Sequence, residues 1–248
     1  MDLGIAGKKA VVAAGTSGLG LASAVSLAAN GAHVAICGRD KERLNAAVAT
    51  VGHGCIGITH DVSEQKGARA FVEDAMTRLG GIDILVTNGG GPPPGNAIDM
   101  PIEMYSMALE LSLLSVISMC QTALPHMRET GWGRIIAITS ISVRQPIPQI
   151  ALSNTARAGV TGYLKSLAGD VAAMGITVNT VQPGVHATDR IKGVYGSSLE
   201  AMATSIPVGF VGDPGDFGEA VAFLASQQAK FITGASINID GGQFAGLQ

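Results

Sequence analysis

Glycines gather at one point near the start of the sequence, where an apolar run gives way to a helical pattern. The run at 9–14 is followed by Gly15, Thr16, Ser17, Gly18, Leu19 and Gly20. A strand, a glycine turn and a helix in this order aim backbone N–H groups and the positive end of the helix dipole at one point, which suits a pyrophosphate. Gly18 and Gly20 would let the backbone approach the phosphates and let the helix pack close to the strand. The alternative is an ordinary strand–helix turn that binds no ligand.

The residues just past the second predicted strand, at 33–37, bear on which dinucleotide would bind. An acidic side chain there accepts a hydrogen bond from the ribose 2′-hydroxyl of NAD, whereas an arginine pairs with the 2′-phosphate of NADP. Gly38 stands at the acidic position and Arg39 follows it. We therefore predict NADP as the cofactor in preference to NAD. A solvated loop arginine is the alternative for Arg39, and Asp40 is expected to cap the next helix.

Two further strand ends carry residues suited to line a nucleotide. Asp61 and Val62 follow a third predicted strand, at 54–58, where an adenine ring would cross the strand ends. Asp61 could equally be a turn residue. The fourth predicted strand ends in Asn88, Gly89 and Gly90. Small residues there leave room for a cofactor, with a plain structural loop as the alternative.

The elements that must position these residues alternate between strand and helix. Strands are expected at 9–14, 33–37, 54–58, 82–87, 133–139, 176–181 and 236–240. Helices are expected from Gly20 to Asn30, and at 41–51, 63–79, 103–127, 150–174 and 214–226. Right-handed βαβ units in this order give a three-layer α/β fold around a doubly wound parallel sheet. The sequence contains no repeat, linker or charge block, so residues 1–248 are expected to form a single domain.

The helix at 103–127 differs from the others because its apolar residues spread over more than one face. Such a helix is buried on two sides, so we expect one side on the sheet and one in a subunit contact. Its methionines are expected to pack rather than to bind a ligand. The polar, glycine-containing stretch 185–198 is expected to form a mobile loop over the site.

The composition argues against several classes of function. Of the 248 residues, 47% are hydrophobic and 14% charged, and the net charge of −3 gives no electrostatic reason to bind nucleic acid or a membrane. No apolar run reaches the roughly 20 residues of a membrane span, and the N-terminus lacks a signal-peptide pattern. Cys37, Cys55 and Cys120 stand singly without a CxxC motif. We therefore expect core cysteines, no metal site and a reducing, cytoplasmic location.

Taken in this order and spacing, the motifs resemble the short-chain dehydrogenase/reductase family, close to its 3-oxoacyl-carrier-protein reductase branch. They are the glycine turn, Asp61-Val62, Asn88-Gly89-Gly90, the strand from Gly133 into Ser140, Ile176 to Asn179, Pro183-Gly184 with Thr188, Thr233-Gly234 and Asp240-Gly241-Gly242. The resemblance covers nearly the whole chain. It implies an open, Rossmann-like sheet of about seven strands, with NAD(P) lying across the strand ends.

The resemblance also implies which residues bind the cofactor and how the chain assembles. Asn88 and its glycines would line the cofactor. Pro183, Gly184 and Thr188 would also bind it, with Thr188 near the carboxamide. The family usually forms a tetramer built partly on the two long helices, so we expect a homotetramer or a homodimer.

The chain departs from the family's catalytic pattern, which is an Asn, a Ser and a Tyr-x-x-x-Lys pair. Ser140 matches the Ser, whereas Ser153 stands at the Tyr position and Arg157 at the Lys position. Ser112 stands at the Asn position, and Ala14 replaces the first glycine of the turn. We take Ser140, Ser153 and Arg157 as the candidate catalytic residues. Arg157 can also hold ribose hydroxyls of the cofactor or a substrate carboxylate.

The two replacements at the Tyr and Lys positions remove the family's general acid. A tyrosine has a pKa of about 10 that a nearby cation can lower toward working pH. A serine hydroxyl has a far higher pKa, and arginine keeps its positive charge but gives up no proton. Ser153 and Arg157 are four residues apart on one helix face, so the geometry of the site can survive without the acid.

Other groups could supply the proton. Tyr163 lies ten residues beyond Ser153 on a different helix face and is expected to pack in the core. Tyr195 and His186 lie in the loop after Pro183-Gly184 and are either donors or surface residues. A water held by the candidate catalytic residues is a further option. Arg144 is either a binding residue for an anionic substrate or part of a loop.

These observations lead to two expectations of function. The first is an NADP-dependent oxidoreductase that acts on a small carbonyl or alcohol substrate with a non-standard proton donor. The second is a catalytically degenerate dinucleotide-binding relative that serves as a sensor or scaffold. Lyase or isomerase chemistry has no positive support among the residues.

Overall fold

The computed structural model describes residues 2–189, 191 and 199–247. Seven parallel strands form one sheet in the order β3-β2-β1-β4-β5-β6-β7. The strands are β1 Lys9–Val12, β2 His33–Gly38, β3 Ile56–Thr59, β4 Ile84–Thr87, β5 Gly133–Ile138, β6 Ile176–Pro183 and β7 Ser236–Ile239. The order reverses between β1 and β4, and ligands of such sheets bind outside the carboxyl ends of the strands at this switch point. The predicted doubly wound sheet is confirmed.

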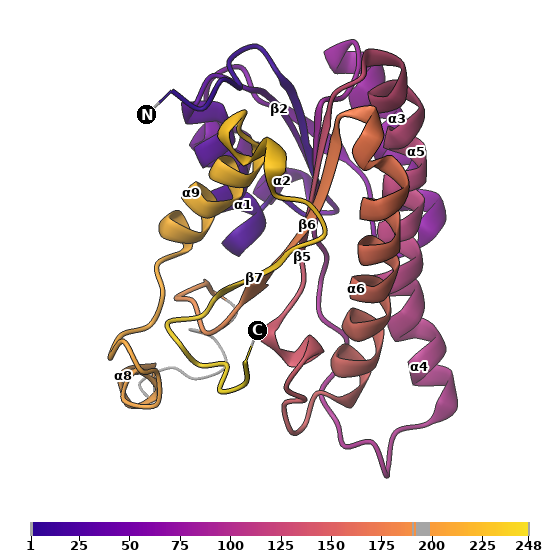
Figure 1. The fold of residues 1–248 in the computed structure, drawn as a ribbon. Coiled ribbons are helices and arrows are strands. Elements are labelled where there is room, and N and C mark those ends of the chain that lie inside the picture. Colours follow the sequence, from indigo (N-terminus) through magenta and orange to yellow (C-terminus); the bar gives the residue numbers. More distant parts are fainter. Residues whose placement is uncertain (1, 190, 192–198, 248) are drawn as a thin grey trace.

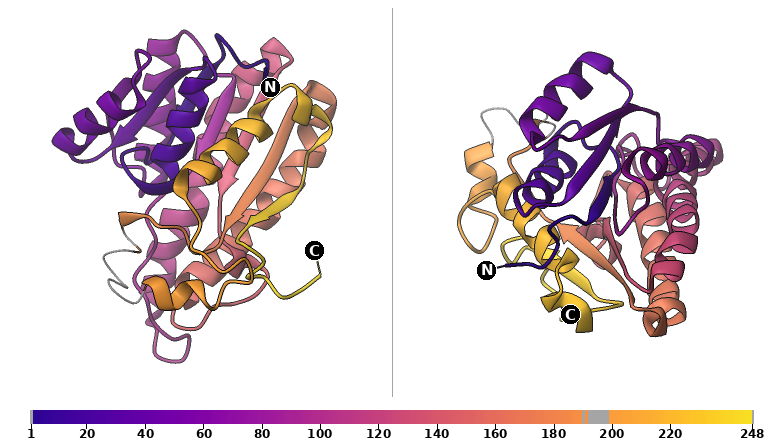
Figure 2. Two further views of the ribbon diagram at one scale, coloured as in Figure 1. Left: turned by 90° about the vertical axis from the view of Figure 1, so that its left-hand side faces the viewer. Right: turned by 90° about the horizontal axis from the view of Figure 1, so that it is seen from above.

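Helices cover both faces of the sheet (Figures 1 and 2). They are α1 Gly18–Ala29, α2 Lys41–Val51, α3 Gln65–Leu79, α4 Ile102–Leu109, α5 Ser115–Thr130, α6 Ala151–Val171, α8 Leu199–Ala203 and α9 Pro214–Ala225. Single helical turns add η1 Glu110–Leu114, η2 Ile141–Val143, η3 Ala172–Met174 and η5 Gln228–Phe231. Helices α1, α2 and α9 lie on one face, and α3, α5 and α6 lie on the other (Figure 1).

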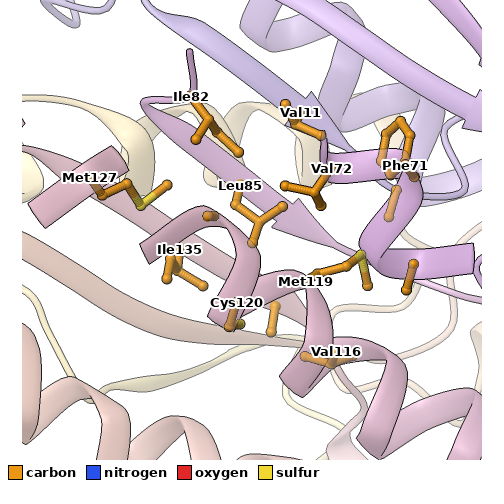
Figure 3. Close-up of a cluster of buried hydrophobic side chains, with 14 of the residues drawn as sticks. Val11, Phe71, Val72, Ile82, Leu85, Val116, Met119, Cys120, Met127 and Ile135 are labelled. Carbon is orange, nitrogen blue, oxygen red and sulfur yellow. The ribbon is translucent and has the colours of Figure 1, made fainter. Parts of the chain in front are cut away.

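Each face has its own apolar core, because the strands are buried on both sides. On the α3/α5 side Val11, Phe71, Leu85 and Met119 pack together (Figure 3). On the other side Val12, Leu27, Ile84 and Phe217 belong to one cluster. Alternate residues of a strand point to opposite faces, so Val11 and Val12 serve different cores. This double burial explains why the strands read as continuous apolar runs.

The cysteines fit the core prediction in part. Cys37 and Cys120 are buried, Cys55 is half-buried, and all three are free. Burial raises the pKa of the Cys37 and Cys120 thiols to about 12. Neither of these two groups is therefore a thiolate at neutral pH.

The predicted single helix at 103–127 is instead α4, the π-helical turn η1 and α5 in succession. Glu110, the first residue of η1, accepts a hydrogen bond from Gln65 N at 2.7 Å, and Ser118 Oγ donates to Gln65 O at 2.9 Å. These bonds tie the π-turn and the first part of α5 to the start of α3. π-helical turns are frequent at functional sites, and this turn contains Ser112.

The run Ile102–Thr130 is long and apolar enough, by length and composition alone, to cross a membrane. A core helix passes the same test, and α5 buries Val116, Met119, Cys120, Ala123 and Met127. In α4 only Ala108 is buried. The single chain thus shows one buried side of α5, and the expected second side in a subunit contact stays a prediction.

Candidate functional site

The glycine turn is fixed to strands on both sides of it. Ala13 N donates to Val86 O in β4 at 3.0 Å, and Gly15 N donates to Cys37 O in β2 at 3.1 Å. Ser17 is the N-cap of α1 in extended conformation, and Gly18 has φ +54°, which favours glycine. The amino end of α1 therefore faces the switch point between β1 and β4.

Gly20 is required by a close approach within the turn. A Cβ atom on Gly20 would lie 2.6 Å from Ala14 O and 2.6 Å from Asn88 Nδ2. Asn88 Nδ2 donates to Ala14 O at 3.3 Å. The predicted residues after β1 and after β4 are thus joined by this hydrogen bond across the switch point.

Arg39 and Asp61 meet at the carboxyl ends of β2 and β3. Arg39 Nη1 lies 3.6 Å from Asp61 Oδ2, and both side chains are well exposed, at 74% and 49%. Burial acts to raise the pKa of Asp61, but hydrogen bonds from Ser63 and the charge of Arg39 outweigh it and hold the pKa below its usual value. Val62 is buried in the core, while Asp40 caps α2 as predicted, accepting from Arg43 N at 2.8 Å.

Ser153 and Arg157 lie together on α6, as their spacing predicts. Arg157 Nε donates to Ser153 Oγ at 3.2 Å. Arg157 Nη1 lies 3.1 Å from both Ile138 O and Thr139 O, at the carboxyl end of β5. The next residue is Ser140, whose Oγ accepts from Ser142 N at 3.1 Å and caps η2. The three candidate catalytic residues thus converge on the end of β5.

A small cavity joins this group to the loop after β4. Its lining includes Asn88, Gly89, Gly90, Ser112 and Arg157. Ser112 Oγ is buried and has no hydrogen-bond partner among the described residues, and the same holds for Thr87 Oγ1, which also lines the cavity. The sequence assigned Ser112 by resemblance alone, and its unpaired hydroxyl becomes visible only in the fold.

Pro183 ends β6, Gly184 and Thr188 follow it, and Thr188 approaches the glycine turn. Gly184 N donates to Ile239 O at 3.0 Å, and Val185 N donates to Gln243 Oε1 at 2.8 Å. The side chain of Thr188 lies 3.3 Å from the place of a Cβ on Gly18. A groove of about 490 Å³ is lined by Thr16, Ser17, Gly18 and Thr188 together with α1, α2 and the start of α9.

Gln243 is a site residue that sequence reasoning missed. It lies 58 residues beyond Val185 in the chain, and no local pattern marks a glutamine for this contact. The C-terminal segment also reaches the loop after Ser140, where Ala245 N donates to Gln145 Oε1 at 3.1 Å.

Tyr163 and His186, two of the candidate proton donors, take other roles. Tyr163 is half-buried against the core, as predicted, and burial together with Cys120 raises the pKa of its hydroxyl. His186 is 4% exposed. Its Nδ1 lies 3.2 Å from Gly184 O, and its ring meets that of Phe217 edge to face. Burial lowers its pKa despite nearby carboxylates. The alternative of His186 as a surface residue is therefore wrong, and its buried ring does not support the alternative of a proton donor.

Tyr195 and most of the predicted loop at 185–198 lie outside the described residues. Arg144 is exposed, with its guanidinium carbon 6.0 Å from the centre of the Phe244 ring. Among the described residues, no three His, Cys, Asp or Glu side chains gather as metal ligands.

Comparisons with known proteins agree with this geometry. A family model described as enoyl-(acyl carrier protein) reductase matches residues 13–243. The 3-oxoacyl-[acyl-carrier-protein] reductase of Vibrio cholerae is 33% identical over 98% of this chain and 99% of its own. Human dehydrogenase/reductase SDR family member 4 is 31% identical over 96% of this chain and 88% of its own.

Solved structures give the same result. The L-sorbose reductase of Gluconobacter frateurii, determined with NADPH and L-sorbose, matches with a TM-score of 0.94 and 30% identity, covering 100% of both chains. Because the family model, the relatives and the fold agree over nearly the full length, the chain belongs to the short-chain dehydrogenase/reductase family of NAD(P)-dependent oxidoreductases.

Proposed function

We propose that this protein is an NADP-dependent oxidoreductase that interconverts a small carbonyl compound and its alcohol, with a proton donor other than tyrosine. The glycine turn is the main support for the proposal, because hydrogen bonds fix it between β2 and β4. The second support is the end of β2, where Gly38 stands at the position of an acid and Arg39 follows it. The NADPH complex of the sorbose reductase supports the choice of cofactor.

The residues present fit a dinucleotide along the carboxyl ends of β1 to β6. Backbone N–H groups of the turn, from Thr16, Ser17, Gly18, Leu19 and Gly20, would hold the pyrophosphate, and Gly15, whose own N–H bonds to Cys37 O, would border it. Arg39 would pair with the 2′-phosphate, and Asp61 and Val62 would border the adenine. Asn88, Gly89, Gly90, Pro183, Gly184, Thr188 and Arg157 would line the remainder. NADP, when bound, would supply or accept the hydride.

Ser140, Ser153 and Arg157 would act on the substrate oxygen. The two hydroxyls can donate hydrogen bonds to a carbonyl oxygen, and the guanidinium 3.2 Å from Ser153 Oγ stabilises negative charge that develops there. Neither a serine nor an arginine releases a proton readily near neutral pH. We therefore propose that a water held by these three residues relays a proton from bulk solvent to the alkoxide that hydride transfer leaves, and is reprotonated by the solvent.

The test is binding and turnover measured side by side. We expect calorimetry to show tighter binding of NADP⁺ than of NAD⁺. We also expect NADPH oxidation with some member of a panel of aldehydes, ketoses and 3-oxoacyl thioesters, and at least a tenfold loss of kcat in the Ser140→Ala variant. Tight NADP⁺ binding without turnover would exclude the catalytic proposal.

A second candidate function is a dinucleotide-dependent sensor or scaffold, favoured by the replacement of both Tyr and Lys. The double variant Ser153→Tyr/Arg157→Lys distinguishes the two. Activity that appears only in the double variant supports the sensor. Turnover by the unaltered protein excludes it.

We also propose a homotetramer or homodimer in the cytoplasm. Several apolar side chains are exposed on the isolated chain, among them Phe223 at 41% and Phe231 at 99%. A subunit contact would cover such residues. Light scattering after size-exclusion chromatography tests the assembly, and a monomer across the micromolar range would contradict it.

A further inference from the structure

Position 38 favours glycine because of a neighbouring side chain, that of Thr16, and not because of its backbone conformation. It ends β2, and its φ is not among the positive values found for glycines of the described chain. A Cβ atom built there would collide with the Thr16 side-chain methyl and would lie 3.4 Å from both Thr16 Cβ and Oγ1. An L side chain at 38 therefore fits only if the Thr16 side chain moves.

Thr16 is held in this place by the turn that carries it. The adjacent Gly15 N donates to Cys37 O at 3.1 Å, and Ala14 N lies 3.3 Å from Cys37 Sγ. A Cβ on Gly15 would itself be 2.8 Å from Ile36 Cγ2. The backbone before Thr16 is thus packed tightly on β2, so Thr16 cannot move away from Gly38 as a unit.

The contact determines what chemistry is possible at the end of β2. An acid at position 38 would accept a hydrogen bond from a ribose 2′-hydroxyl, but Thr16 occupies the space where its side chain would begin. The groups left there are the Thr16 hydroxyl and the guanidinium of Arg39. Both can donate to a phosphate oxygen.

Asp61 does not restore an acceptor at this point. Its carboxylate already pairs with Arg39 at 3.6 Å, and both side chains are exposed. An exposed ion pair of this kind is weak, so a 2′-phosphate can exchange for Asp61 at the guanidinium.

We infer that Thr16 is a specificity-determining residue of the cofactor site: it fills the place of the acidic side chain that NAD binding uses, and so keeps the site selective for a 2′-phosphate. The inference rests on the proposed function, because it requires a dinucleotide over the glycine turn. It follows that positions 16 and 38 act as a pair, and that NAD preference needs both to change.

The packing step is tested without any ligand. Thermal unfolding is compared for the unaltered protein, Gly38→Ala, Thr16→Ala and the double variant. We expect Gly38→Ala to lower the midpoint by at least about 4 °C, and to lower it far less when Thr16→Ala is present, because contacting residues are not additive. Equal losses in both backgrounds would show that Thr16 does not exclude a side chain at 38.

The specificity step is tested by calorimetry with NADP⁺ and NAD⁺. We expect Gly38→Asp to lose at least about tenfold in NADP⁺ affinity without gaining NAD⁺ affinity. Thr16→Ala/Gly38→Asp should then bind NAD⁺ at least about tenfold more tightly than Gly38→Asp does. Thr16→Ser/Gly38→Asp, which retains the hydroxyl and removes the methyl, tests whether the methyl alone is the obstacle.

The failures are distinguishable. If Gly38→Asp alone gains as much NAD⁺ affinity as the double variant, the role of Thr16 is wrong while the proposed function stands. If the unaltered protein binds neither dinucleotide, both the proposed function and the role of Thr16 in cofactor selectivity are wrong. The thermal cycle still reports the packing in that case.

Discussion

Arg157 anchors its guanidinium to two backbone carbonyls at the end of β5 and contacts Ser153 Oγ at 3.2 Å. A lysine at the same position would offer a mobile ammonium group, whereas the planar guanidinium fixes several hydrogen bonds at once. Arg157 therefore supplies a positive charge and holds Ser153 in place, and the proton must come from another group.

This division of roles predicts a distinctive pH profile. With water as the proton donor, kcat for NADPH-dependent reduction should be nearly constant from about pH 6 to 9, because no side chain in the group titrates there. Steady-state rates at saturating NADPH test this. A bend in the profile that disappears in Tyr195→Phe would instead identify Tyr195 as the donor.

His186 predicts a pH dependence of stability. Burial lowers its pKa in the folded chain, so below the ordinary value of about 6.5 the unfolded state binds a proton that the folded state does not. Stability should therefore fall as the pH drops below about 6.5. His186→Gln should reduce that slope, by at most about 1.4 kcal/mol per pH unit. Urea titrations of both proteins between about pH 5 and 8 measure it. Identical slopes would contradict the assignment.

At the scale of elements, the first turn of α1 leaves no free space for an added side-chain carbon at Gly20. The Cβ of Gly20→Ala would lie 2.6 Å from Ala14 O and from Asn88 Nδ2. Overpacking of this kind typically costs about 1–3 kcal/mol. We expect such a loss in the free energy of unfolding, together with weaker NADP⁺ binding.

Gly162→Ala is the matched control. Gly162 lies inside α6, and a Cβ there would have no neighbour within 4 Å. Alanine in an exposed helix interior should raise stability by about 0.5–1 kcal/mol and leave dinucleotide affinity unchanged. Denaturant titration and calorimetry on both variants make the comparison. A harmless Gly20→Ala would remove the steric argument.

At the scale of the whole molecule, the C-terminal segment holds the strand end that would face the nicotinamide. Gln243→Ala removes the acceptor for Val185 N, a bond of 2.8 Å. We expect NADP⁺ affinity to fall about three- to tenfold, because a lost hydrogen bond is worth roughly 0.5–1.5 kcal/mol.

Gln228→Ala provides the comparison, because that side chain also makes a bond far along the sequence, from Nε2 to Asp2 O at 2.6 Å, away from the glycine turn. Its loss should not change dinucleotide binding. Equal effects of the two variants would mean that the C-terminal segment does not support the site.

The sequence predicted what local patterns determine. The strands, the glycine turn and the Asp40 cap all depend on neighbours within a few residues, and each lies close to its expected place. The group of Ser153 and Arg157 followed from helical spacing, although its role rested on the family pattern.

Features built by distant contacts could not be predicted. The π-turn is bonded to Gln65 through Glu110, which lies 45 residues away. The Thr16 methyl comes to lie at the place of a Cβ on Gly38 only once β1 and β2 are paired. His186 is buried in part because α9 places Phe217 against it. Periodicity carries no information on such pairs.

The late position of α9 in the chain affects how the protein is made. Phe217, Val221 and Ala222 belong to the same apolar cluster as Ile84 and residues of β5. While the ribosome is still translating, β4 and β5 emerge long before this helix does. A nascent chain of that length exposes apolar strand surface, which makes it prone to aggregate until α9 has been synthesised.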